Sequence, residues 1–95
     1  MKCKLSKGAA QDLEDIYLYG FIHFGEAQAD TYAETLEKRI EIICANPEIG
    51  RMDTRVNPAV RRFESENHVI FYDIDDKHIF IVRILHGATD YVQYL

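Results

Sequence analysis

The first third of the chain has apolar residues that recur every three or four positions. Ser6 precedes this pattern, and its hydroxyl can accept a hydrogen bond from a free amide of a first helical turn. Gly25 follows the pattern and can adopt the left-handed conformation that ends helices. The spacing predicts one helix with a single apolar face. That face consists of Leu13, Ile16, Tyr17, Gly20, Phe21 and Phe24.

A second helix is expected from about Glu26 to Ala45. Its exposed face carries Asp30, Glu34, Glu37, Lys38 and Glu41. Its buried face would be Ala29, Tyr32, Ala33, Leu36, Ile40 and Ile43. Pro47 ends the helix because its ring disfavours helical geometry at Asn46. The joint at Gly25 is one residue long, so the two amphipathic helices should form a helical hairpin.

After Pro47 the helical period disappears. Residues 47–58 contain two prolines and one glycine and predict a loop. β-Rich segments are found at 2–5, 60–63, 69–74 and 79–85, and the last two form a hairpin across Asp75-Asp76. We therefore expect one α/β (α+β) domain over residues 1–95. An N-terminal strand precedes the helical hairpin, a three-stranded antiparallel meander follows it, and the hairpin packs on one face of the sheet.

Charge is unevenly distributed along the chain. Lys plus Arg total 11 and Asp plus Glu total 16, which gives a net charge of −5 and argues against a protein that binds nucleic acid through bulk basic charge. The one dense basic feature is the segment 51–62. It contains Arg51, Arg55, Arg61 and Arg62.

Composition also limits location and cofactors. No apolar run approaches the roughly 20 residues that span a bilayer, and the N-terminal residues lack the apolar stretch of a signal peptide, so a cytoplasmic protein without membrane contact is expected. Cys3 and Cys44 should then be reduced and buried. No His or Cys spacing resembles a metal site and no glycine-rich run precedes either helix, so we expect no metal and no cofactor.

The segment Ile81 to Asp90 resembles the ParE toxins of the RelE/ParE superfamily, and five further segments resemble the same family in the same order. The most specific of the six is the ending Arg-Ile-Leu-His-x-x-x-Asp at 83–90. The others are Leu5-Ser6 to Tyr17, Phe24-Gly25 to Tyr32, Asn46-Pro47-Glu48-Ile49-Gly50-Arg51, Val60-Arg61-Arg62-Phe63 and His68-Val69-Ile70-Phe71-Tyr72. Together these segments cover nearly the whole chain.

The resemblance implies the toxic half of a type II toxin–antitoxin pair, neutralised by a cognate antitoxin whose C-terminal segment wraps the toxin. Operator DNA would be contacted only through the antitoxin. ParE-like toxins poison DNA gyrase, whereas other members of the superfamily are ribosome-dependent mRNA ribonucleases. A third alternative is a non-toxic corepressor that only binds the antitoxin.

A metal-free ribonuclease needs a base, cations that hold the phosphate and an acid. The candidates here are His86 or Glu64 as base, Arg61, Arg62 and Arg83 as cations, and Tyr91 or Tyr94 as acid. The tail 90–95 contains no Lys or Arg, which favours gyrase over RNA as the target.

The candidate residues also have structural interpretations. Arg83 lies in an apolar strand and could pair with Asp90 or Asp73, and His86 could hydrogen-bond to Asp90. Arg61 and Arg62 are neighbours on a strand, so their side chains should point to opposite faces of the sheet.

Two binding surfaces are predicted. The surface for an acidic target, or for gyrase-bound DNA, consists of Arg51, Arg55, Arg61, Arg62, Arg83 and His86. The surface for the antitoxin uses Tyr17, Phe21, Phe24 and Tyr32, because two short helices need fewer aromatic side chains than this for their own core.

Overall fold

The computed structural model describes residues 2–95 and contains two long helices, five strands and two short 3-10 helices. The helices are α1 (Lys7–Phe24) and α2 (Glu26–Ala45). The strands are β1 (Lys2–Leu5), β2 (Arg51–Asp53), β3 (Val60–Ser65), β4 (His68–Ile74) and β5 (His78–His86). The 3-10 helices are η1 (Pro47–Ile49) and η2 (Tyr91–Tyr94). The predicted fold class is confirmed.

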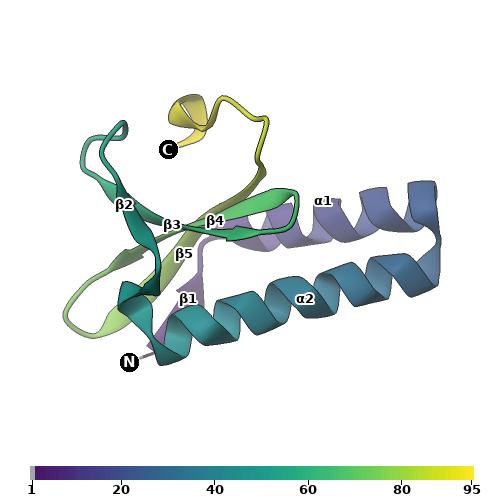
Figure 1. Ribbon diagram of the computed structural model, residues 1–95, viewed down its shortest axis with the longest axis horizontal. Coiled ribbons are helices and arrows are strands. Elements are labelled where there is room, and N and C mark those ends of the chain that lie inside the picture. The colour runs from purple at the N-terminus through teal and green to yellow at the C-terminus, as the bar shows by residue number, and fades with distance from the viewer. Residues whose placement is uncertain (1) are drawn as a thin grey trace.

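The strands form one sheet in the order β1-β5-β4-β3-β2. β1 runs parallel to β5, and every other neighbouring pair is antiparallel. The helical hairpin packs against one face of this sheet, and its far end extends beyond the strands (Figure 1). The short segment that ends in η2 lies on the other side of the sheet (Figure 1).

The prediction of a featureless loop over 47–58 is wrong in part. Its residues Arg51–Asp53 form β2, which pairs with β3 in the register Arg51↔Arg62 and Asp53↔Val60. The meander therefore has four strands rather than three. A strand of three residues is too short for alternation to reveal it, and its one apolar residue, Met52, is exposed.

Both ends of α1 have the predicted caps. The Oγ of Ser6 accepts a hydrogen bond from the amide of Ala9 at 2.9 Å. Gly25 has a φ of +90°, a conformation that residues with a Cβ rarely adopt, and it allows α2 to begin one residue later.

Two apolar clusters hold the layers together. The first lies between the hairpin and the sheet and includes Leu36 and Ile43 of α2 with Ile70 and Tyr72 of β4. The second lies on the opposite face, where Tyr91 and Leu95 pack against a cluster that includes Phe71. Both faces of the central strands are therefore buried, which accounts for the apolar character of β4 and β5 on both sides.

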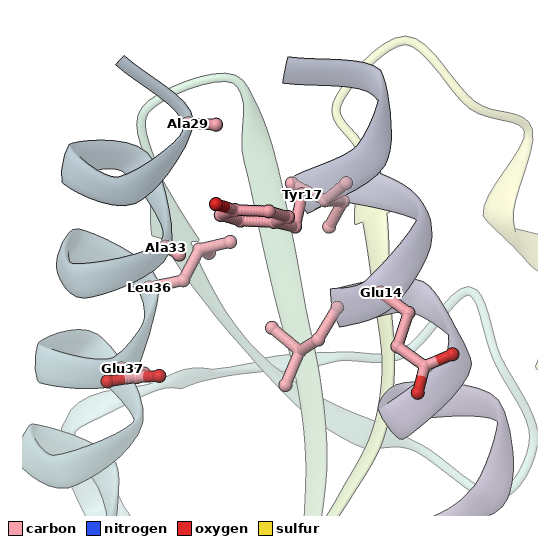
Figure 2. Close-up of a pocket in the computed structure, with 8 residues that line it drawn as sticks. Glu14, Tyr17, Ala29, Ala33, Leu36 and Glu37 are labelled. Atoms are coloured by element: carbon pink, nitrogen blue, oxygen red, sulfur yellow. The ribbon is translucent and has the colours of Figure 1, made fainter. Parts of the chain in front are cut away.

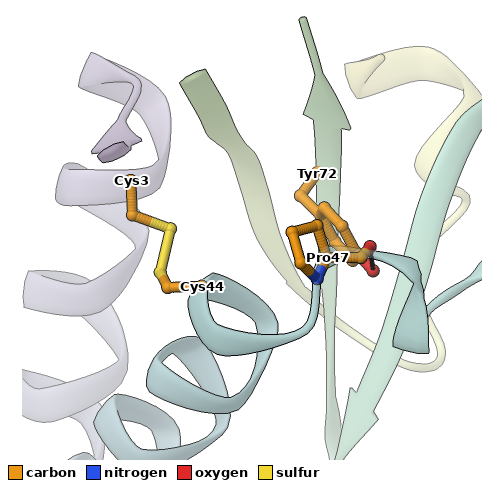
Figure 3. Close-up of a disulfide and its surroundings, with 4 residues drawn as sticks. All are labelled: Cys3, Cys44, Pro47 and Tyr72. Atoms are coloured by element: carbon orange, nitrogen blue, oxygen red, sulfur yellow. Dashed lines mark hydrogen bonds between the residues drawn. A yellow bond between two sulfur atoms is a disulfide. The ribbon is translucent and has the colours of Figure 1, made fainter. Parts of the chain in front are cut away.

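The expectation that both cysteines are reduced is wrong. Cys3 of β1 and Cys44 of α2 form a disulfide with a Cα–Cα distance of 5.9 Å (Figure 3). Spacing along the chain could not reveal this pair, because 41 positions separate the two residues. Packing of the end of α2 beside β1 brings them together.

Tyr72 fixes the turn that leaves α2. Its side chain is fully buried, and its hydroxyl donates to the carbonyl of Pro47 at 2.6 Å. The same oxygen accepts from the amide of Gly50 at 2.8 Å. Figure 3 shows Pro47 and Tyr72 in contact at the end of α2. One hydroxyl thus satisfies the carbonyl of the first residue of η1 and the amide of the residue that follows η1, and it sets the approach to β2.

We expect Tyr72→Phe to lower the free energy of unfolding by about 1–3 kcal/mol, since it leaves a partly buried carbonyl and a buried amide without their partner. Urea unfolding followed by circular dichroism measures this loss. Tyr19→Phe is the matched control, because Tyr19 is 60% exposed, and it should change stability by less than about 0.5 kcal/mol. Equal stabilities for both variants would contradict the prediction.

Candidate functional site

Arg83, a candidate for both target binding and catalysis, forms an ion pair with Asp12 of α1. Its Nε and Nη2 donate to the two carboxylate oxygens of Asp12 at 2.7 and 2.9 Å. Oδ2 of Asp12 also accepts from the amide of Ile84 at 2.8 Å. The hydrogen bond from Arg83 to Asp12 raises the pKa of the guanidinium. Neither Asp90 nor Asp73 is the partner, so both predicted pairings are wrong.

The Asp12–Arg83 pair could not be found from local spacing, because 71 positions separate the two residues. A second residue that the sequence did not single out is Gly8 of α1. A Cβ at Gly8 would lie 2.8 Å from Cδ of Arg83, so a glycine is what lets the side chain pass α1. On its other side, the Arg83 guanidinium lies 5.4 Å from the centre of the Tyr94 ring.

Asp53 joins two of the four remaining arginines of the predicted target surface. Its carboxylate accepts from Nε and Nη2 of Arg55 at 3.2 and 3.1 Å, and from Nη1 of Arg62 at 3.2 Å. The hydroxyl of Tyr91 donates to Oδ2 of the same carboxylate at 2.7 Å. Arg55 and Arg62 also lie 4.9 and 5.5 Å from the centre of the Tyr91 ring. Asp53, which the sequence did not single out as a site residue, therefore ties β2 and β3 to the C-terminal segment.

The same contacts stabilise the charged form of Asp53. The Arg55 side chain is the main cause, followed by the Tyr91 hydroxyl, the Arg55 amide and Arg62, and together they hold the pKa of the Asp53 carboxyl far below its usual range. The carboxyl is nearly fully buried, which by itself would raise its pKa, so the hydrogen bonds outweigh burial.

The last two arginines of the predicted target surface also have internal partners. Nη2 of Arg51 lies 2.6 Å from Oε1 of Glu64, and Nη1 of Arg61 donates to the carbonyl of Gly50 at 2.8 Å. Arg51 and Arg55 keep side chains that are 69% and 65% exposed, whereas that of Arg62 is 14% exposed. A partner can therefore reach Arg51 and Arg55 most easily.

Arg61 and Arg62 point to opposite faces of the sheet, as predicted. Arg61 is paired with Tyr72, whose side chain belongs to the cluster beneath the helices. Arg62 is paired with Phe71, whose side chain belongs to the cluster on the other face. Arg83 is also paired with Phe71, so Arg62 and Arg83 lie on the same face of the sheet and Arg61 lies on the other.

His86 does not hydrogen-bond to Asp90, so that expectation is wrong. Nδ1 of His86 accepts from the amide of Ala88 at 3.1 Å, because the chain turns immediately after β5. Asp90 instead accepts from the side chain of Gln93 at 2.9 Å. The His86 ring lies 5.5 Å from that of His68, and burial together with His86 lowers the pKa of His68.

The aromatic residues predicted for the antitoxin are divided between two grooves and the end of the hairpin. A groove of about 650 Å³, here called the hairpin–sheet groove, lies between the end of the hairpin and the β3–β4 turn. Phe24 and Tyr32 line it together with His68 and His86. Tyr32 and Nδ1 of His68 are hydrogen-bonded to each other.

The second groove has a volume of about 370 Å³ and lies between α1 and α2 (Figure 2). We call it the interhelix groove. Tyr17 lines it, and its hydroxyl donates to Asp30 at 2.7 Å, a bond that raises the pKa of Tyr17. Phe21 lines neither groove; it is 46% exposed on the last turns of α1. There the hairpin extends beyond the sheet (Figure 1), so no strand covers this end of α1 in the part of the chain that the structure describes.

Among residues 2–95, no three His, Cys, Asp or Glu side chains are placed to hold a metal ion. Within the same range, neither helix is long and apolar enough to cross a membrane.

Comparison with known proteins agrees with this architecture. The family described as "ParE toxin of type II toxin-antitoxin system, parDE" matches residues 3–91. The chain belongs to the ParE toxin family. A Toxin ParE1 from Caulobacter vibrioides is 37% identical over 87 residues, covering 92% of this chain and 90% of the relative. A Toxin ParE1 from Mycobacterium tuberculosis H37Rv is 33% identical over 87 residues, covering 90% and 89%.

A solved structure supports the same assignment to the ParE family. The "Chromosomal ParDE TA system from P. aeruginosa" superposes on this chain with a TM-score of 0.80. It is 27% identical in sequence, and the match covers 90% of this chain and 95% of the other. The ParE resemblance of the sequence is therefore confirmed, together with its implied fold.

Asp53→Asn tests the network around Asp53 in this ParE-family chain. At pH 7 we expect a loss of about 3 kcal/mol in the free energy of unfolding, because the substitution removes a buried charge that two arginines face. The pKa is depressed in the folded state, so this stabilisation is complete above the unfolded pKa of about 4 and is lost as the pH falls below it.

Urea unfolding of wild type and variant at several pH values measures the difference. The two stabilities should converge as the pH falls from about 5 towards 2. Asp76→Asn, in the exposed β4–β5 turn, should run parallel to wild type throughout. A constant gap between Asp53→Asn and wild type across this range would refute the proposed role of the carboxylate charge.

Proposed function

We propose that this chain is the toxic component of a type II toxin–antitoxin pair, that a cognate antitoxin holds it inactive, and that the free protein binds and poisons DNA gyrase. On this proposal it acts by binding one state of its target rather than by catalysis. It needs no cofactor, and it reaches operator DNA only through the antitoxin.

One observation carries the choice of binding over RNA cleavage. The cations of the ribonuclease alternative are each engaged by the protein itself: Arg61 by backbone carbonyls, Arg62 by Asp53 and Arg83 by Asp12. A metal-free ribonuclease needs free cations that converge on one phosphate. Arginines that are held by fixed acceptors and divided between the two faces of the sheet supply shape and local charge to a partner, which is what a binding surface requires.

Family membership supports the antitoxin as partner, since the solved neighbour is itself a ParDE toxin–antitoxin system. The exposed aromatic side chains at the end of the hairpin support the same proposal. Phe21 and Phe24 are 46% and 59% exposed there, and Leu18 and Ile22 add further exposed apolar surface. An apolar patch beside two grooves is typical of a surface that a partner covers.

Adding the purified chain to a gyrase supercoiling assay tests the choice of target. We expect inhibition with accumulation of cleaved DNA, and intact mRNA when the chain is added to a translation extract. Arg51→Ala and Arg55→Ala should each weaken inhibition, by roughly tenfold if one desolvated ion pair is lost. Lys38→Ala on the exposed face of α2 is the control.

Cleavage of mRNA with unaffected gyrase would overturn the proposal in favour of the ribosome-dependent mRNA ribonuclease. Normal growth of cells that express the folded chain alone would favour the non-toxic corepressor.

Phe21→Asp tests the antitoxin surface. The side chain is exposed, so the variant should keep its circular dichroism spectrum and melting temperature. Affinity for the antitoxin should fall at least about tenfold, because a charge then occupies an apolar contact. Ile42→Asp, 40% exposed near the other end of α2, is the matched control and should bind as wild type does. Wild-type affinity of Phe21→Asp would remove Phe21 from the interface.

A further inference from the structure

The interhelix groove combines an apolar floor with acidic sides. Leu13, Ile16 and Tyr17 line it from α1, and Ala29, Ala33 and Leu36 line it from α2. Ala29 and Ala33 are small, which leaves room between the helices where larger side chains would close the gap. Figure 2 shows the Tyr17 ring reaching across this gap from α1 towards α2, with the strands behind.

Two carboxylates complete the lining, Glu14 from α1 and Glu37 from α2 (Figure 2). In the part of the chain that the structure describes, neither forms an ion pair. Neither has a Lys or Arg three or four positions away on its own helix, which are the positions where a helical ion pair could form. Asp12 and Asp53 differ in this respect, because each forms an ion pair with an arginine of the same chain.

The wider charge pattern matches these two residues. Residues 8–37 contain seven Asp and Glu and no Lys or Arg. One of the seven, Asp12, is neutralised by Arg83. The remaining acidic surface repels DNA and acidic proteins and attracts cations. The hairpin and the arginine-bearing end of the sheet thus have opposite charge, and the hairpin suits a basic partner.

From this combination we propose that the interhelix groove takes a long basic side chain, Lys or Arg, from the antitoxin. The aliphatic stem lies on Leu13, Ala33 and Leu36, and the cationic head lies between Glu14 and Glu37. Lys and Arg pair an apolar stem with a charged head, so each matches both parts of the groove. The proposal rests on the proposed function, because it takes the antitoxin as the partner that covers the hairpin.

The groove can be tested without the antitoxin, with n-butylguanidinium as a probe and n-butylurea as its neutral analogue. We expect the probe to shift the backbone amide NMR signals of Leu13, Ala33 and Leu36 saturably, with a Kd on the order of 1–10 mM. The combined variant Glu14→Gln/Glu37→Gln should weaken this binding at least about fivefold. Glu41→Gln, an exposed position on α2 outside the groove, controls for general charge. Equal shifts with n-butylurea, or equal binding by the combined variant, would overturn the proposal.

The second measurement uses the cognate antitoxin of the proposed function, titrated by calorimetry. Glu14→Gln and Glu37→Gln should each raise the Kd by about tenfold, or about 1.4 kcal/mol. Replacing the antitoxin's buried Lys or Arg by Met should do the same, with no further loss against the combined Glu14→Gln/Glu37→Gln variant. If the combined variant binds the antitoxin as tightly as wild type does, the groove proposal is wrong and the proposed function still stands. No binding by the wild-type chain sinks the proposed pairing with this antitoxin, and the n-butylguanidinium result then decides the groove.

Discussion

The arrangement of this molecule depends on how the outer side of β5, the side away from β4, is completed. β1 pairs with β5 only as far as Ile81, so the following residues of β5 would present unpaired backbone groups at an edge. α1 takes the place of the missing strand. Ser6 Oγ donates to the carbonyl of Val82 at 2.6 Å and Asp12 accepts from the amide of Ile84, so two side chains complete the ladder. The Asp12 carboxylate also forms an ion pair with Arg83 of β5, and these contacts fix the helical hairpin against the sheet.

This use of Arg83 changes how the basic residues are interpreted. A charge inside an apolar strand suggests a catalytic or binding group, yet here it locks α1 to β5. Asp53 does the same for Arg62, and it adds the Tyr91 hydroxyl from the C-terminal segment. The Asp12–Arg83 pair joins α1 to β5, which share no backbone ladder, whereas the Asp53–Arg62 pair reinforces the ladder between β2 and β3. Among the arginines of segment 51–62, Arg51 and Arg55 therefore keep the most exposed side chains, whereas residues 8–37 of the hairpin carry only acidic charges.

The parts of the fold that local pattern controls could be predicted, and the parts made by distant pairing could not. Ser6 and Gly25 mark the ends of α1 because caps are local, and the apolar face of α2 follows from its period. β2 could not be predicted because three residues are too few to show alternation. The Cys3–Cys44 and Asp12–Arg83 pairs could not be predicted because they join residues 41 and 71 positions apart. For the candidate site, sequence located the arginines and the exposed aromatics. It could not say that the fold uses Arg62 and Arg83 itself, since Asp12 and Asp53 look like ordinary acidic residues.

The disulfide closes a covalent ring that runs from Cys3 through both helices to Cys44. The far end of that ring is the turn at Gly25, which lies beyond the sheet and is the exposed point of the hairpin (Figure 1). A protease that cuts there leaves two fragments that are still covalently joined at the base of the hairpin. In the oxidised protein, a single cut at this turn therefore does not release a helix. The mass of the molecule increases only by that of the one water consumed in the cleavage.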